Sequence, residues 1–199
     1  MSVVSNAGLW YAARGTGVVA LVLLTIVVAL GIASRSGRQV AGLPRFAVAT
    51  VHRNASLLAV LLIGVHIATL LLDSKAGVKV TDLFVPFVGA YRPFWQGLGT
   101  LGLELIVALV GTGLLRRHMP ERLWRGVHWL AYLCWPVAFM HGLGTGTDSG
   151  TVWMRGIAAV CALAIGTAVT WRLAPRFVEH GHLRRPLVRH SVATSGRTR

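Results

Sequence analysis

The clearest chemical signal in this sequence is a set of four histidines, His52, His66, His128 and His141. Each lies in or at the edge of an apolar stretch, and the members of the two successive pairs are 14 and 13 residues apart. Neutral imidazole is a common axial ligand of haem iron, and a polar ring without a binding partner is costly inside a membrane. Two helices that each carry one histidine near either membrane face could therefore hold two haems stacked across a bilayer. The alternative is that these histidines form hydrogen bonds between helices.

The composition places the histidines in an integral membrane protein. Of the 199 residues, 54% are hydrophobic and only 13% are charged, and the mean hydropathy is +0.64. These values exclude an ordinary soluble domain. Both cysteines, Cys134 and Cys161, fall inside apolar stretches, so we expect free thiols that pack as small apolar groups.

Five apolar segments are each close to the ~20 residues that a helix needs to cross a bilayer. A helix satisfies its own backbone hydrogen bonds in lipid, so we expect an all-α membrane protein built as a bundle of five transmembrane helices. The membrane domain is predicted at 1–173, with a basic cytoplasmic tail at 174–199. The expected spans are 9–33, 51–72, 95–115, 124–143 and 152–172.

The basic residues orient this bundle. Fifteen of the twenty Lys and Arg residues lie between the first and second spans, between the third and fourth, or after the fifth. The positive-inside rule then predicts an N-terminus outside and a C-terminus in the cytoplasm. Most of the formal charge of +14 is explained by topology and by contact with anionic membrane lipid. We therefore expect a multi-pass protein of a cell membrane, of bacterial plasma-membrane type, with no nucleic-acid partner.

This orientation makes the second and fourth spans parallel, which predicts the pairs His52–His128 near the inner face and His66–His141 near the outer face. The rise between histidines is about 21 Å in one span and about 19.5 Å in the other, so the depths match. Around the helix axis, 14 residues leave the rings about 40° apart, but 13 residues leave them about 140° apart. We therefore expect the fourth span to be distorted near Trp135–Pro136, which would re-aim His141.

The segment His52-x13-His66, and the run 123–132 around His128 with His141 after it, resemble the ferric reductase-like transmembrane domain. That superfamily includes NADPH oxidases, ferric reductases and the haem subunit of bacterial methionine sulfoxide reductase systems. The resemblance extends over about residues 9–172. It implies two b-type haems with bis-histidine ligation, and electron flow from the cytoplasm to the outer face. Such iron has no open position, so electron transfer would be outer-sphere.

The chain departs from the oxidases and ferric reductases after its last span. Those proteins carry a cytoplasmic domain there that binds FAD and NAD(P)H, whereas the residues after Trp171 form a short basic tail without a glycine-rich phosphate loop. We therefore expect no FAD or NAD(P) site in this chain. The electron donor would be a separate protein, a flavin or a quinol. The acceptor would be ferric iron, oxygen or an extracytoplasmic flavoprotein.

Three further residues are candidates for contact with a haem. Arg14, at the outer end of the first span, resembles a haem-contacting arginine of the family's oxidases and would pair with an anionic propionate. Arg53 is a candidate at the inner haem, with topology and lipid contact as the alternative. Trp135 lies midway between His128 and His141, where it would either ease electron transfer between macrocycles or simply pack.

Two other functions compete with an electron conduit. A small transporter would use the intramembrane polar residues, including Glu104, for substrate or protons, although paired broken helices are lacking. A haemless scaffold subunit would use the same residues for helix packing. Detection of a low-spin b-type haem separates the conduit from both.

Overall fold

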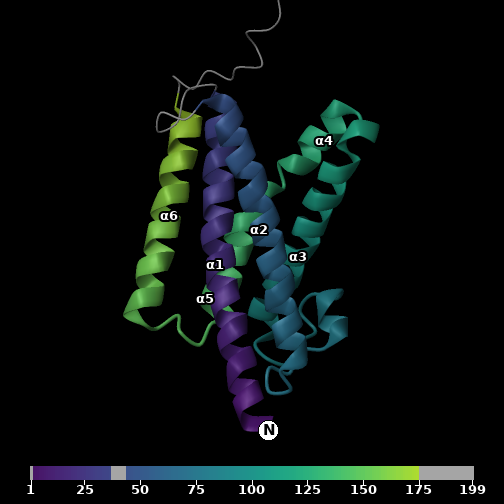
Figure 1. Cartoon of the computed structure of the whole chain (residues 1–199), viewed down its shortest axis with the longest axis vertical. Coiled ribbons are helices and arrows are strands. Elements are labelled where there is room, and N and C mark those ends of the chain that lie inside the picture. Colours follow the sequence, from purple (N-terminus) through teal and green to yellow (C-terminus); the bar gives the residue numbers. More distant parts are fainter. Residues whose placement is uncertain (1, 37–43, 175–199) are drawn as a thin grey trace, which may run out of the picture.

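The computed structural model describes residues 2–36 and 44–174, and helices are the only regular secondary structure in this part of the chain (Figure 1). Its long helices lie along one axis and alternate in direction from one to the next, apart from one short tilted helix at the end of α3. The elements are α1 (Ser2–Ser36), α2 (Arg45–Leu72), η1 (Val80–Leu83), α3 (Pro93–Leu114), η2 (Leu115–His118), α4 (Glu121–His128), α5 (Ala131–Thr145) and α6 (Val152–Leu173).

Prolines mark the starts of three of these helices. Pro44 and Pro120 are the residues that precede α2 and α4, and Pro93 is the first residue of α3. A proline suits these positions because the first helical residues need no backbone donor and its φ is already fixed. α6 ends at Leu173, and Ala174 adopts an extended conformation, as expected for a residue that precedes a proline.

Four helical segments are long and apolar enough to cross a membrane: Ala7–Arg35, Phe46–Leu72, Pro93–His118 and Val152–Leu173. They coincide with the first, second, third and fifth expected spans. The prediction of an all-helical membrane fold is therefore confirmed for the described residues, whereas the predicted tail at 174–199 lies almost wholly outside them.

The fourth expected span, 124–143, is divided in two. α4 ends at His128, a turn follows at Trp129–Leu130, and α5 then begins. The interruption of this span lies directly after His128, whereas α5 is continuous through Trp135–Pro136, where the sequence predicts a distortion. The turn separates a short, charged, strongly amphipathic helix from an apolar one, and these two helices suit different surroundings.

α1 lies at the centre of the bundle and packs against α2, α5 and α6, while α3 packs mainly against α5. A core forms between α1, α5 and α6 around Val28, Ile32, Trp135 and Cys161. Cys161 and the equally buried Cys134 are free thiols, as the sequence predicts. The α1–α2 pair and the α3–α5 pair thus stand beside each other, and the candidate site lies between them.

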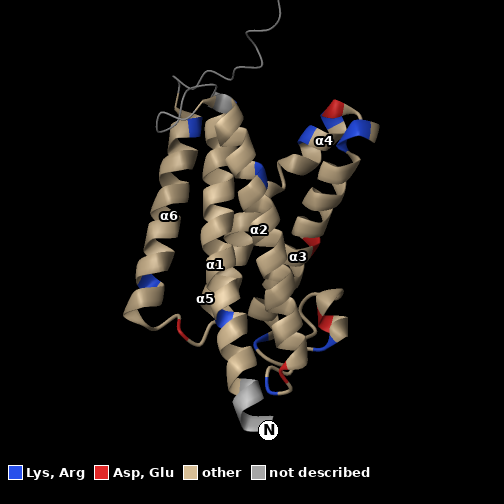
Figure 2. Cartoon of the chain, in the orientation of Figure 1, with Lys and Arg blue, Asp and Glu red and all other residues tan. Residues whose placement is uncertain are grey.

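Charged side chains are unevenly distributed between the two ends of the bundle. Figure 2 shows Lys and Arg gathered around α4, whereas the opposite end mixes basic with acidic residues. The acidic residues of that opposite end include Asp73, Asp82 and Asp148, in the segments that follow α2 and α5. The end that contains α4 is therefore the more basic one.

Candidate functional site

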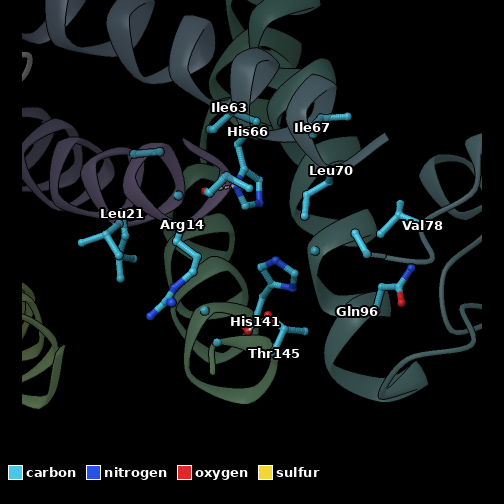
Figure 3. A pocket seen from close by; sticks show the side chains of 18 of the residues that line it. Arg14, Leu21, Ile63, His66, Ile67, Leu70, Val78, Gln96, His141 and Thr145 are labelled. Carbon is cyan, nitrogen blue, oxygen red and sulfur yellow. Dashed lines mark hydrogen bonds between the residues drawn. The ribbon is translucent and has the colours of Figure 1, made fainter. Parts of the chain in front are cut away.

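The two predicted outer histidines face one cavity. Figure 3 shows His66, from α2, and His141, from α5, pointing into the same space between the two helix pairs. The cavity has a volume of about 720 Å³ and is lined largely by apolar side chains of α1, α2, α3 and α5. The two histidines come from segments 75 residues apart in the sequence, so the bundle itself brings them together.

Three of the four histidines are held in the same way, by a backbone carbonyl of a neighbouring helix. The Nδ1 atom of His52 lies 3.0 Å from the Val27 carbonyl oxygen, and that of His66 lies 2.7 Å from the Ala13 oxygen. The Nδ1 atom of His141 lies 2.9 Å from the Trp95 oxygen. A carbonyl can only accept, so Nδ1 carries the proton in each case. Neutral rings held in this way keep the lone pair of Nε2 free for a metal.

The fourth histidine, His128, is held differently. It is the last residue of α4, and its ring stacks on Trp124 with centroids 5.1 Å apart. No hydrogen bond to its ring nitrogens occurs within the described part of the chain. Arg116 also lies over the Trp124 ring, with its guanidinium carbon 4.3 Å from the centroid. His128 is therefore positioned by aromatic stacking beside a cluster of cations.

Two pairs of these histidine rings lie near each other. His128 is close enough to His52 for an electrostatic interaction between the rings, and His141 is similarly close to His66. Among the described residues, no group of three or more His, Cys, Asp and Glu side chains is placed to hold a metal ion. Each pair therefore offers two nitrogen ligands, and a metal held there would need its other ligands from a cofactor.

Arg14, a predicted site residue, lines the outer cavity. Its guanidinium forms an ion pair with Asp148, in the segment that joins α5 to α6, and lies 3.9 Å from the centroid of the Trp10 ring. It is thus a cation at the edge of an apolar cavity, held by one acidic and one aromatic partner. Arg53, the candidate for the inner site, is exposed on α2 immediately after His52.

Trp135 lies in the core rather than in the outer cavity. Its indole Nε1 donates a 2.9 Å hydrogen bond to Thr25 Oγ1, and its ring stacks on Phe139 with centroids 4.9 Å apart. The residue is 8% exposed and packs with Val28 and Ile32 of α1. Glu104, which the sequence singled out as an intramembrane carboxylate, is exposed on α3.

One buried carboxylate that the sequence analysis did not select helps to build the cavity wall. Asp82 of η1 accepts hydrogen bonds from the Lys79 backbone N–H at 3.0 Å and from Gln96 Nε2 at 3.1 Å. The Thr100 hydroxyl donates to the Asp82 carbonyl oxygen at 2.6 Å. These bonds fix η1 against the start of α3, beside the outer histidines. No local pattern predicts this contact, because Asp82 and Gln96 meet only through the fold.

Comparison with known proteins identifies the family. No curated protein and no solved structure matches the chain significantly. The family described as "Ferric reductase like transmembrane component" matches residues 16–140, which is more than half of the chain and includes His52, His66 and His128. The match ends one residue before His141, whose ring nevertheless shares a cavity with His66. The resemblance seen in the sequence is confirmed, and the chain belongs to the ferric reductase-like transmembrane component family.

Proposed function

We propose that this protein is a transmembrane electron-transfer subunit that holds two b-type haems, one between His52 and His128 and one between His66 and His141. The observation that carries the proposal is the hydrogen bond from Nδ1 to a backbone carbonyl at three of the four histidines. This bond is the usual outer partner of a metal-bound imidazole, because it fixes the ring and makes Nε2 a better ligand.

The outer cavity fits a haem in size, polarity and donor set. Its volume of about 720 Å³ lies within the ~300–1,000 Å³ of typical cofactor sites. Its lining is mainly apolar, and Arg14 supplies a cation for an anionic propionate. Two histidines would complete the coordination of an iron whose four other ligands come from a porphyrin. A haem bound in this way supplies one-electron chemistry without an open coordination position.

The inner pair supports a second haem through the same donor set. His52 has its Nδ1 bonded to the Val27 carbonyl, and His128 lies close to it at the more basic end of the bundle. Arg35 and Arg116 are near enough to His128 to interact with its ring electrostatically. These cations could pair with inner propionates, a role that the sequence analysis gave to Arg53.

The charge distribution supports an orientation with the α4 end in the cytoplasm. Five crossings follow if α4 and α5 together make the fourth, which places the N-terminus outside and the C-terminus inside. Electrons would then enter near His52 and His128 and leave near His66 and His141. We propose that the donor is a separate protein, a flavin or a quinol, and that the acceptor is ferric iron, oxygen or an extracytoplasmic flavoprotein. Membrane lipid surrounds the bundle.

Optical spectroscopy of the purified full-length protein tests this function. We expect oxidised and dithionite-reduced spectra of a low-spin b-type haem, with two haems per chain by pyridine haemochrome. His118→Ala, which changes an exposed histidine in η2, is the control and should retain both haems. A folded wild-type protein without haem would overturn the proposal and would favour a transporter or scaffold role.

A further inference from the structure

The three carbonyls that hold histidines share a local sequence feature. In each case the residue four positions after the carbonyl is a glycine: Gly17 follows Ala13, Gly31 follows Val27, and Gly99 follows Trp95. We call each carbonyl with its glycine a seat. Two seats lie on α1 and face α2, and the third lies on α3 and faces α5.

The geometry of an α-helix explains why the residue four positions later matters. The Cα–Cβ bond points toward the N-terminus, so a side chain at position i+4 covers the carbonyl of residue i. A glycine leaves that carbonyl open to a ring from another helix. A Cβ atom built on Gly99 would lie 2.5 Å from Cε1 and 2.7 Å from Nδ1 of His141. The glycine is therefore required for the observed ring position.

The same clash is graded across the three seats. A Cβ on Gly17 would lie 3.1 Å from both Nδ1 and Cε1 of His66, which is tighter than ordinary contact. A Cβ on Gly31 would lie 3.4 Å from Cε1 of His52, at the edge of ordinary contact. Neighbouring glycines behave differently, because a Cβ on Gly15 of α1 would meet nothing within 4 Å.

The two seats on α1 have the same spacing as the two histidines on α2. Ala13 and Val27 are 14 residues apart, as are His52 and His66. Fourteen residues return to nearly the same face of a helix, so antiparallel α1 and α2 keep one register at both sites. The spacing of the glycines on α1 is thus matched to the spacing of the histidines on α2.

α3 carries the same 14-residue spacing. Gly113 lies 14 residues after Gly99, and four residues before it is Leu109, 14 residues after Trp95. A fourth seat is therefore present in the sequence of α3, at the end where α4 packs. In the structure a Cβ on Gly113 would meet nothing within 4 Å. His128, the histidine that has no carbonyl partner among the described residues, lies on α4.

We propose that Gly17, Gly31, Gly99 and Gly113 are positioning residues for the four histidines. The fourth seat, formed by the Leu109 carbonyl and Gly113, receives Nδ1 of His128 when the inner site is loaded. This inference rests on the proposed haem ligation and adds the residues that set the orientation and basicity of each ligand. Loss of such an outer partner lowers the affinity of a site for its metal by about 10–100-fold.

Alanine substitutions in the full-length protein test the seats. We expect Gly99→Ala and Gly17→Ala to lower haem affinity at the outer site by about 10–100-fold, with the larger effect at Gly99. Gly31→Ala should have the smallest effect of the three, at the inner site. The matched controls are Gly15→Ala on α1 and Gly111→Ala on α3, because a Cβ at either position meets nothing within 4 Å.

Readouts other than activity separate positioning from general damage to the fold. A ligand without its Nδ1–H···O=C bond is less basic and stabilises ferric iron less, so the midpoint potential of the affected haem should rise. The electron paramagnetic resonance spectrum should also change, because it reports the orientation of the two imidazole planes. Circular dichroism and gel filtration confirm the fold, and the milder Gly17→Ala keeps the test valid if Gly99→Ala does not fold.

The outcomes distinguish this inference from the proposed function. If the wild type binds no haem, the proposed function fails and the seats lose their role with it. If the wild type binds two haems but Gly17→Ala and Gly99→Ala match the controls in potential and spectrum, only the positioning role is overturned. If Gly113→Ala behaves like Gly111→Ala while the other three seats respond in the expected order, the fourth seat is refuted.

Discussion

The Nδ1 atom of His66 lies 2.7 Å from the carbonyl oxygen of Ala13, and this contact joins the outer half of α2 to α1. The ring is thereby turned so that it faces His141 across the cavity rather than the surrounding lipid (Figure 3). A polar bond of this kind is favourable in an apolar region, where an unpaired N–H would be costly. The same contact therefore stabilises helix packing and leaves Nε2 free, as the proposed haem ligation requires.

Removal of one histidine should empty only its own site. We expect His66→Ala and His141→Ala each to leave one haem per chain, with the same surviving midpoint potential, because both act on the outer pair. His52→Ala and His128→Ala should leave the other haem, with a different potential. Redox titration of the four variants checks this pairing. A shared surviving potential for His66→Ala and His52→Ala would contradict it.

Matched variants can separate the effect of the Arg14 charge on the haem potential from the effect of its ion pair with Asp148. We expect Arg14→Gln to lower the midpoint potential of the outer haem, because loss of a nearby positive charge disfavours the reduced form. Asp148→Asn removes the ion pair but keeps the cation, so it should leave that potential higher than Arg14→Gln does. Spectroelectrochemistry measures both values. Equal shifts in the two variants would show that the ion pair alone matters.

Trp135 is expected to act through packing. Trp135→Phe loses the buried hydrogen bond to Thr25 and should lower stability by about 1–3 kcal/mol. We expect no change in the rate at which the outer haem is reduced through the inner one, because the indole lies in the core between α1, α5 and α6. Thermal unfolding and stopped-flow reduction measure the two quantities. A slower reduction with unchanged stability would instead support the relay role.

Pro136 should be dispensable for the geometry of the site. Because the helix is interrupted at Trp129–Leu130, Pro136→Ala should retain both haems and both potentials. The restored N–H can donate to the Tyr132 carbonyl, so stability should be unchanged or higher. Haem content and the melting temperature check this. Loss of the outer haem in this variant would show that the proline aims His141 after all.

Labelling of single cysteines should report the proposed orientation. Cys134 and Cys161 are buried thiols, so background reaction with a membrane-impermeant maleimide should be low. We expect Thr147→Cys to react in intact cells and Arg117→Cys to react only after the membrane is opened. Both positions are exposed in the structure. The reverse labelling pattern would show that the bundle has the opposite orientation in the membrane, and the proposed direction of electron flow would then be wrong.

The sequence predicts the parts of this protein that depend on local pattern. Apolar length is enough to find four membrane-length helices, and spacing is enough to expect His66 and His141 at a similar depth, where both line one cavity. The turn at Trp129–Leu130 has no comparable local signal, because it contains no proline and reflects a change from a charged helix to an apolar one. Contacts such as Asp82 with Gln96 depend on tertiary packing, which no local pattern encodes.

The seats fall between these two cases. Gly17 and Gly31 repeat the 14-residue spacing of His52 and His66, and that match is visible in the sequence. The sequence alone does not assign a role to these glycines, because small residues are common wherever membrane helices pack closely. Only the structure shows that each glycine uncovers a carbonyl that a histidine reaches.

The interruption after His128 has a consequence for how the protein matures. Both histidines of the proposed outer site are held by a backbone carbonyl of a neighbouring helix, so we expect that site to be preorganised in the folded chain. The proposed inner site also needs His128, which lies at the end of the short helix α4, next to a turn, and has no carbonyl partner among the described residues. Cofactor loading should therefore be ordered, with the outer site filled first and the inner site closed afterwards. A biogenesis intermediate that holds a single haem would carry it near the outer face.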